Sequence, residues 1–240
     1  MAQGQEVVGL TAKDMAAITA LADLDEEHLE TIAKRCRGLK VRAGSEVVGY
    51  EDTTTDVYFI VSGSVRASAF AATGRHITFQ ILRAGAMFGE LSAIDGLPRS
   101  SNVFAEEDCL LARLSAQSFC ALMRANPDFS FAITLRVVEM ARWLRTRVFE
   151  YHAYDVKGRV YSEVLRLADD ARTDPAVDAL VIQPAPTDAD LASRVGTTRE
   201  NVNRIINGLK ANQVAERTPD GLRVHSVNVL KQWLAASEAG

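Results

Sequence analysis

One long stretch of the chain, residues 128–154, contains neither proline nor glycine. Apolar side chains recur there at steps of three and four, so we expect one α-helix roughly 40 Å long at about 1.5 Å per residue. One apolar stripe comprises Ile133, Val137, Met140, Leu144, Val148 and Tyr151, and a second comprises Phe131, Leu135, Val138 and Phe149. A helix with two apolar faces needs two surfaces to pack against.

This requirement limits the architectures that the chain can adopt. One face of the helix can cover a neighbouring domain while the other pairs with the same helix of a second chain, which predicts a homodimer with coiled-coil-like packing. The alternative is a helix buried between two domains of a single chain. Periodicity alone leaves both arrangements open.

The residues before the helix have a different periodicity. From about Leu39 to Leu114, β-branched and aromatic runs such as DVYFIVSGSVRASAF and HITFQILRAGAMFGEL are punctuated by glycine. Several short strands at such spacing are typical of an antiparallel barrel or jelly roll. Ahead of them, DEEHLETIAKRC has apolar residues at helical spacing behind an acidic first turn, which predicts a short leading helix.

The residues after the long helix return to helical spacing. We expect Asp155–Gly158 to break the helix, with the glycine poorly placed for continuation. The segments then expected are a helix over 159–171, a loop over 173–186, helices over 187–194 and 198–212, and a hairpin that turns at Pro219-Asp220-Gly221. Two helices joined by a short glycine-bearing turn and followed by a hairpin are the arrangement of a winged helix-turn-helix.

Charge is unevenly distributed along the chain. The net charge of −4 and the pI of about 5.6 give no overall electrostatic footprint for nucleic acid or an anionic membrane. Residues 1–155 carry 16 basic and 20 acidic side chains, whereas residues 156–240 carry 11 of each. Residues 193–217 carry five basic and two acidic side chains, so the expected helix-turn-helix has a local charge of +3.

Several functional classes lack the residues that they need. Cys36, Cys109 and Cys120 form no C-x-x-C pair, and the four histidines are scattered, so we expect no disulfide scaffold, zinc site or other metal site. The chain shows no nucleophile motif and no grouped histidines and carboxylates, so we expect no catalytic residues and no enzyme. It also lacks a signal sequence and an apolar run long enough to span a membrane, which predicts a cytoplasmic protein without a membrane partner.

The second helix of the expected helix-turn-helix carries polar side chains suited to DNA. Thr187 can cap the first helix, and Thr197 or Thr198 can cap the second, so that each helix start can also present amides to a phosphate. Arg199, Glu200, Asn203 and Arg204 project from the first two turns of the second helix, opposite its apolar face. Arg can bind guanine O6 and N7, and Glu can accept from cytosine N4. The alternative is that these residues are ordinary solvated charges.

The segment FGELSAIDGLPRSS predicts an anion pocket. Gly89-Glu90-Leu91 resembles the start of a helical turn whose amides can hold an anion, and Arg99-Ser100 adds a guanidinium and a hydroxyl suited to a phosphodiester. Glu90 would repel a phosphate unless it accepts from a neutral donor such as a ribose hydroxyl. A cyclic nucleotide supplies both groups. The alternative is a structural ion pair between Glu90 and Arg99.

These two motifs, joined by a long helix, resemble the cyclic-AMP receptor protein branch of the bacterial cyclic-AMP receptor/fumarate–nitrate regulator superfamily. FGEL followed by RSS is similar to the family's phosphate-binding cassette, and VGTTRENVNRI is similar to its recognition-helix signature. The resemblance implies an α+β chain with a cyclic-nucleotide-binding jelly roll over residues 1–127, a dimerisation helix over 128–154 and a winged helix-turn-helix over 155–240. It implies a cyclic-nucleotide-gated homodimer that binds palindromic double-stranded DNA.

The resemblance also implies residue roles. Glu90 would bind the ribose, and Arg99 and Ser100 the cyclic phosphate. The full expected ligand set is Gly89, Glu90, Leu91, Arg99, Ser100, Ser101, Arg142 and Thr146. The expected DNA-binding set is Thr187 and Thr198 on phosphates, Arg199, Glu200 and Arg204 on the bases of TGTGA-like half-sites, and Asn203 beside them. RNA polymerase is a further expected partner, at the loop over 170–186.

One departure from the family keeps the effector open. The family's receptor reads adenine with a Thr-Ser pair on the long helix, whereas this chain has Trp143-Leu144-Arg145-Thr146-Arg147 in that region. Thr146 is the only hydroxyl nearby, so both cAMP and cGMP are candidate effectors. The alternatives are a regulator of the same fold gated by haem or a small metabolite, with His76 or a cysteine as an iron ligand, a constitutive regulator, a nucleotide hydrolase, and an oligomeric scaffold.

Overall fold

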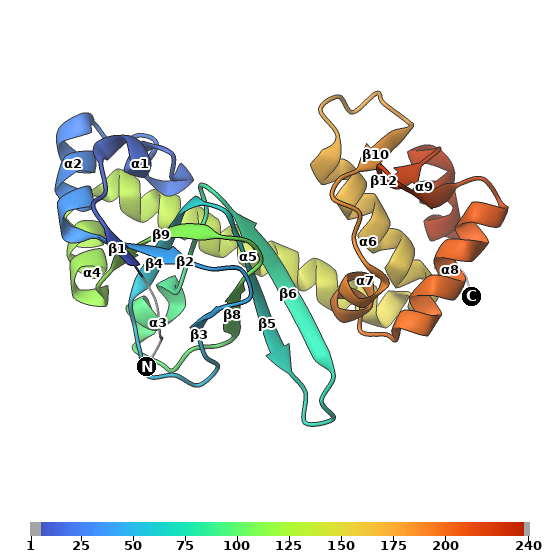
Figure 1. Cartoon of the computed structure of the whole chain (residues 1–240), viewed down its shortest axis with the longest axis horizontal. Coiled ribbons are helices and arrows are strands. Elements are labelled where there is room, and N and C mark those ends of the chain that lie inside the picture. The colour runs from blue at the N-terminus through green and yellow to red at the C-terminus, as the bar shows by residue number, and fades with distance from the viewer. Residues whose placement is uncertain (1–5, 238–240) are drawn as a thin grey trace. The chain divides into compact units, whose positions relative to one another are not determined.

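The computed structural model describes residues 6–237, and these residues divide between Met140 and Ala141 into two compact units (Figure 1). The first unit contains β1 (Glu6–Val8), α1 (Ala12–Ala16), a 3-10 turn (Thr19–Leu21), α2 (Glu26–Arg35), β2 (Arg37–Val41), β3 (Glu46–Val48), β4 (Val57–Ser62), β5 (Ser64–Phe70), β6 (His76–Arg83), β7 (Met87–Phe88), α3 (Glu90–Asp95), β8 (Asn102–Ala105), β9 (Cys109–Leu114) and α4 (Ala116–Ala125). Its strands form a five-stranded sheet in the order β1-β2-β9-β4-β7 and a four-stranded sheet in the order β3-β8-β5-β6. Each pairing is antiparallel, so the predicted jelly-roll class is confirmed.

Strand β4 shows why this unit has a core on each side of its larger sheet. Side chains alternate between the two faces of a strand. Val57 and Phe59 belong to a cluster formed with the helices, whereas Tyr58 and Ile60 belong to the cluster between the sheets. All four side chains are buried, which explains why the segment VYFI is continuously apolar.

The long helix α5 (Pro127–Ala153) follows α4, and its predicted existence is confirmed with each end shifted by one residue. Phe129 and Ile133 anchor its first turns in the core beside α4, and Phe119 of α4 packs edge-on against Phe129. The predicted second stripe, Phe131, Leu135, Val138 and Phe149, is exposed in the single chain. Its members therefore contribute nothing to the core of either unit.

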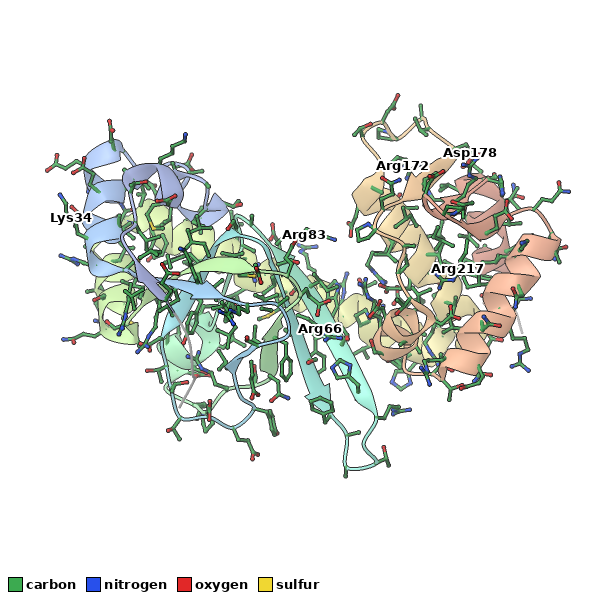
Figure 2. The ribbon with its side chains drawn as sticks, viewed as in Figure 1. Lys34, Arg66, Arg83, Arg172, Asp178 and Arg217 are labelled. Carbon is green, nitrogen blue, oxygen red and sulfur yellow. The ribbon has the colours of Figure 1, made fainter. Side chains whose placement is uncertain are left out.

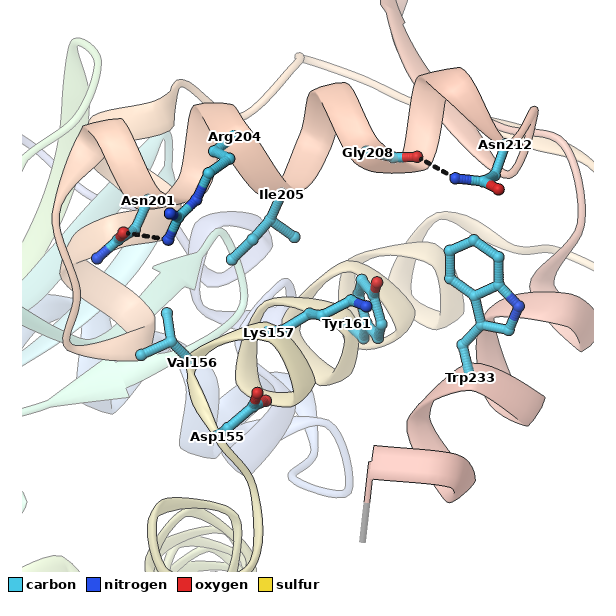
Figure 3. Close-up of a pocket in the computed structure, with 10 residues that line it drawn as sticks. All are labelled: Asp155, Val156, Lys157, Tyr161, Asn201, Arg204, Ile205, Gly208, Asn212 and Trp233. Carbon is cyan, nitrogen blue, oxygen red and sulfur yellow. Dashed lines mark hydrogen bonds between the residues drawn. The ribbon is translucent and has the colours of Figure 1, made fainter. Parts of the chain in front are cut away.

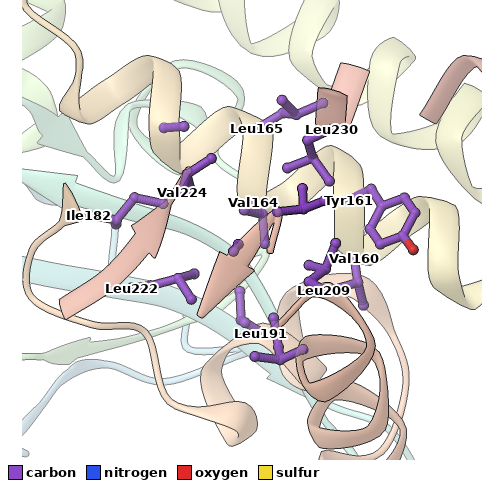
Figure 4. Close-up of a cluster of buried hydrophobic side chains, with 14 of the residues drawn as sticks. Val160, Tyr161, Val164, Leu165, Ile182, Leu191, Leu209, Leu222, Val224 and Leu230 are labelled. Carbon is purple, nitrogen blue, oxygen red and sulfur yellow. The ribbon is translucent and has the colours of Figure 1, made fainter. Parts of the chain in front are cut away.

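The second unit contains the remainder of α5 and the predicted winged helix-turn-helix. Its further elements are α6 (Val156–Ala171), β10 (Leu180–Ile182), α7 (Asp188–Val195), α8 (Arg199–Ala211), β11 (Ala215–Thr218), β12 (Gly221–Val224) and α9 (Val227–Ser237). The strands form one antiparallel sheet in the order β10-β12-β11. One cluster, which includes Val164, Leu191, Leu209 and Leu222, joins α6, α7, α8 and the sheet (Figure 4).

The structure corrects several predicted boundaries. Gly158 does not break a helix: it lies in the first turn of α6, where its amide donates to the Asp155 cap, and the interruption falls between Ala153 and Val156. The predicted loop over 173–186 contains strand β10, which adds a third strand beside the hairpin. Strand β1, helix α1 and the 3-10 turn were not predicted.

Among residues 6–237, no helix has the length and apolar character that crossing a membrane requires.

Candidate effector pocket and DNA-recognition helix

The tight turn before α3 depends on Gly89. Its φ of 90° lies in the left-handed region, and a Cβ there would approach the Asp56 carbonyl oxygen at 2.6 Å and Arg99 Nη1 at 2.7 Å. No side chain caps the first turn of α3. The missing Cβ therefore lets the backbone pass directly against the Arg99 guanidinium.

The Arg99 side chain is buried although it carries a charge, with 4% of the residue exposed. Its Nε donates to Thr54 Oγ1 at 3.2 Å, Nη1 to the Gly89 carbonyl at 3.2 Å and Nη2 to the Asp56 carbonyl at 2.7 Å. These partners are all neutral, and burial lowers the pKa of Arg99. Since a guanidinium has five N–H donors, these bonds fix its plane and leave donors for an anion.

Glu90 is equally buried, but its ion-pair partner is Arg136 of α5, with 4.0 Å between Glu90 Oε1 and Arg136 Nε. Arg136 Nη2 also donates to the Met87 carbonyl at 2.8 Å, while its buried Nε has no hydrogen-bond partner. Among the described residues, Arg99 forms no ion pair with Glu90. The alternative prediction, a structural ion pair between Glu90 and Arg99, is therefore wrong.

Most of the predicted ligand set lines one cavity of about 100 Å³ between the sheets, α3 and α5. Gly89, Glu90, Leu91, Arg99, Ser100 and Ser101 all contribute to its lining, together with Arg136 and Met140. Ligand sites commonly occupy about 300 Å³ or more, so a nucleotide requires side chains of this lining to move apart.

Arg142 and Thr146 are not among the described residues that line this cavity. Both are exposed on α5, and Thr146 Oγ1 donates to the Arg142 carbonyl at 3.1 Å. Their assignment to the effector stays a prediction.

Arg136 was not among the predicted ligand residues, although its position in the sequence carries a signal. Phe129, Ile133, Arg136 and Met140 follow one another at steps of four, three and four, which places an arginine on the inward stripe of a helix. A buried charge needs a partner, and Glu90 on α3 is that partner. Only the fold could identify Glu90, which precedes Arg136 by 46 positions in the sequence.

The helix-turn-helix is built from two capped helices. Thr187 Oγ1 accepts from the Asp190 amide in a capping box at the start of α7, and Thr198 Oγ1 accepts from the Asn201 amide at the start of α8. Gly196 ends α7 with a φ of 67°. Val202 and Leu209 are fully buried on the inner face of α8, which fixes its orientation against α6 and α7.

The predicted DNA-reading side chains lie on the exposed part of α8. Arg199, Glu200, Asn203 and Arg204 are all exposed. Hydrogen bonds from its own backbone amide and from the Thr198 hydroxyl lower the pKa of Glu200. The Asn203 amide nitrogen donates to Asp188 Oδ2 at 3.0 Å. Glu200 and Asn203 are thus oriented by neighbours in the helix-turn-helix itself.

Asp188 also holds the wing. Arg217 of β11 (Figure 2) forms an ion pair with Asp188 Oδ1 at 2.5 Å and donates to the Pro186 carbonyl. One of the two carboxylates in the first turn of α7, that of Asp188, is therefore paired with the β11–β12 hairpin, which reduces repulsion between this turn and a phosphate backbone.

Arg204 lies at the edge of an open groove of about 630 Å³ between α6, α8 and α9 (Figure 3). Its Nη2 donates to Asn201 Oδ1 at 2.9 Å, as the dashed line in Figure 3 marks. Tyr161 of α6 and Trp233 of α9 form the apolar side of the groove, with ring centroids 6.0 Å apart.

Comparison with known families agrees with the geometry of both units. Residues 39–126 match the family described as cyclic nucleotide-binding domain, and residues 158–233 match the Crp-like helix-turn-helix domain. The chain is 27% identical over 183 residues to the cAMP-activated global transcriptional regulator CRP of Haemophilus influenzae, a match that covers 76% of this chain and 81% of that protein.

Solved structures agree in fold. A CooA mutant from Carboxydothermus hydrogenoformans superposes with a TM-score of 0.76 at 18% identity, covering 95% of this chain and 98% of that one. The c-di-GMP responsive global regulator CLP of Xanthomonas campestris superposes with a TM-score of 0.68 at 19% identity, covering 84% of this chain and 99% of that one.

The fold and both sites define a transcriptional regulator with a cyclic-nucleotide-binding domain and a helix-turn-helix domain. The chain belongs to the cyclic-AMP receptor protein/fumarate–nitrate regulator superfamily, whose members are DNA-binding transcription regulators and not enzymes.

Proposed function

We propose that the protein is a homodimeric regulator whose sequence-specific binding to palindromic DNA is gated by a cyclic nucleotide. The observation that carries the gating is the buried Arg99 guanidinium, which is held by three neutral acceptors beside the unobstructed backbone of Gly89. A buried charge without an ion-pair partner among the described residues is stabilised by a bound anion. Arg99 and Ser100 then hold the cyclic phosphate, and Glu90 accepts from the ribose hydroxyl.

The effector class is cAMP, cGMP or both. The similarity to a cAMP-activated relative supports cAMP, whereas the absence of the Thr-Ser pair in residues 143–147 leaves the purine undetermined. Calorimetric titration of the full chain with cAMP, cGMP and c-di-GMP tests this class. Micromolar or tighter binding of a cyclic mononucleotide supports the proposal. Binding of c-di-GMP alone, or of none of the three, assigns the pocket to another effector or to a constitutive regulator.

The homodimer accounts for the exposed stripe of α5. The side chains of this stripe are between 42% and 65% exposed: Phe131, Leu135, Val138 and Phe149. Coiled-coil-like packing against a second α5 would bury this face. Light scattering coupled to size exclusion should give about twice the chain mass of 26.1 kDa. Leu135→Glu should shift the protein toward the monomer, because a charge on this face resists desolvation.

The DNA partner is a palindrome with TGTGA-like half-sites. Arg199, Glu200 and Arg204 contact bases, Asn203 lies beside them, and Thr187 and Thr198 contact phosphates. The two recognition helices then lie about 34 Å apart, one turn of DNA. Selection from a random duplex library followed by gel shift with and without cyclic nucleotide tests both the site and the gating. Selected sites without two-fold symmetry would contradict the dimeric arrangement.

A role for RNA polymerase is part of the same proposal. Its contact would be the loop over 170–186, where Arg172, Asp174 and Pro175 lie outside the hydrophobic core of the unit. Alanine substitutions in this loop should lower transcription from a target promoter without changing DNA affinity.

A further inference from the structure

The last two turns of α5 enter a buried cluster of charges within the second unit. Glu150 of α5 and Glu163 of α6 are 5% and 4% exposed. Three guanidinium groups surround them, from Arg147 of α5, Arg166 of α6 and Arg194 of α7. We refer to these five residues as the clamp cluster.

Each carboxylate of the clamp cluster bridges several elements. Arg147 Nη1 lies 3.0 Å from Glu150 Oε2 and 3.1 Å from Glu163 Oε2. Arg166 contacts both carboxylates, and Arg194 Nη1 lies 3.1 Å from Glu163 Oε1. Since each guanidinium presents a rigid fork of donors, the cluster fixes the orientation of α5 relative to α6 and α7 and not only their separation.

Arg147 also reaches the end of α7 where the turn to the recognition helix begins. Its Nη2 donates to the Arg194 carbonyl, and Arg159 Nε of α6 donates to the Val195 carbonyl at 3.0 Å. The last carbonyls of a helix lack intrahelical partners and attract cations. Two arginines from α5 and α6 therefore hold the C-terminus of α7.

Gly196, the residue after α7, packs closely against α5. A Cβ on Gly196 would lie 2.7 Å from Tyr151 Oη of α5. Gly196 precedes the Thr198 cap of α8 by two residues, so the position of Tyr151 restricts where the recognition helix can begin.

We propose that Arg147 and Glu163 are positioning residues for the recognition helix, and that the last two turns of α5 move as one body with the helix-turn-helix. Two observations carry this inference: the clamp cluster itself, and the close packing of Tyr151 against Gly196 at the turn before the recognition helix.

This inference rests on the DNA-binding role of α8 and does not depend on which effector binds. Its first test therefore uses the full chain without DNA or nucleotide. Hydrogen exchange measured by mass spectrometry reports the amides of Tyr154, Gly158 and Arg159, which donate hydrogen bonds to Glu150 at the end of α5 and to Asp155 at the start of α6. We expect slow exchange there, and exchange at least 10-fold faster in Arg147→Gln with residues 127–136 unchanged. Exchange at the rate of an unstructured peptide in the wild-type protein overturns the proposal.

The second test distinguishes positioning from simple stabilisation. Lysine in place of Arg147 keeps the charge but cannot contact two carboxylates and a carbonyl with a planar fork. The control is Arg145→Lys, because Arg145 is exposed and makes no side-chain hydrogen bond or ion pair with any other described residue. The probe is a duplex selected by the wild-type protein from a random library.

We expect Arg147→Lys to bind the selected duplex at least 10-fold more weakly, and to lose discrimination against a scrambled duplex, at a temperature where circular dichroism shows it folded. Arg145→Lys should bind as the wild type does. Unchanged affinity and discrimination in a folded Arg147→Lys overturn the positioning role.

If Arg147→Lys does not fold, Ser162→Ala replaces it. This substitution removes only the hydroxyl that donates to Glu150 Oε1 at 2.6 Å. It should weaken binding about threefold, and no change in affinity or discrimination overturns the role. A wild-type protein that selects no DNA contradicts the proposed function, whereas the exchange test still decides the rigidity of the clamp.

Discussion

Replacement of Arg99 by lysine separates the ligand role of this side chain from its structural role. Lysine keeps the positive charge but cannot serve the acceptors on Thr54, Gly89 and Asp56 together with an anion. At least one buried carbonyl then loses its donor, which costs about 1–3 kcal/mol of folding stability. For a chain of this size, that loss lowers the Tm by roughly 2–12 °C.

The substitution should also weaken binding of the effector. Loss of a charge-assisted hydrogen bond to the cyclic phosphate costs about 1.5–3 kcal/mol, which is about a 10- to 150-fold increase in Kd. The assay is calorimetric titration with cAMP and cGMP at 20 °C, where the variant should remain folded. The control is Arg83→Lys, because Arg83 at the end of β6 is exposed (Figure 2) and is not among the residues that line the cavity.

The two measurements give distinct outcomes. A lower Tm with a Kd within twofold of the wild-type value would show that Arg99 only supports the backbone around Gly89, and would refute its assignment to the phosphate. A raised Kd in the Arg83→Lys control would show that the loss does not depend on contact with the cavity. Only an increase specific to Arg99→Lys agrees with the geometry.

Three further substitutions or reagents test other parts of the structure. Gly89→Ala should lower the free energy of unfolding by about 1–3 kcal/mol in thermal denaturation, because the added Cβ meets the Asp56 carbonyl oxygen. The control is Gly74→Ala, which is also at positive φ but has nothing within 4 Å of its Cβ, and so reports backbone strain alone. Equal losses in the two variants would show that the contact between Gly89 and Asp56 is unimportant. Arg204→Ala should cost about 1–3 kcal/mol of DNA affinity and relax preference at one base pair, and uniform weakening on all sequences would make Arg204 a phosphate contact. Burial raises the pKa of Cys36 to about 12. Because the thiolate is the reactive form, alkylation of Cys36 by iodoacetamide at pH 8 should be about a thousandfold slower than that of a free thiol. Rapid alkylation in the folded protein would contradict the packing around α2.

A strand or helix could be predicted from the sequence where its apolar residues recur with the period of that element. The alternation in β4 and the three-and-four spacing in α5 and α8 identify these elements because each places apolar residues on a definite side. Short elements with few apolar residues, such as β1 and β10, carry too little periodic signal, and their strand conformation depends on pairing with β2 and β12.

Gly158 shows why a local propensity can mislead. Glycine lowers helix propensity, yet this position tolerates only a small residue, because a Cβ would meet Ser237 Oγ at 2.7 Å and Tyr154 Cβ at 3.0 Å. The Asp155 cap and the burial of α6 outweigh the propensity. The sequence contains the glycine but not the neighbours that require it.

The sequence by itself determined the two classes of site, because the residues of each lie close together along the chain: Gly89 to Ser101 for the effector, and Thr187 to Arg204 for DNA. The tertiary structure alone decided the partners of buried charges. Glu90 pairs with Arg136, and Arg147 reaches Glu163 and the end of α7. Ion pairs form between side chains that the fold brings within a few ångströms, and their separation in sequence places no limit on that distance.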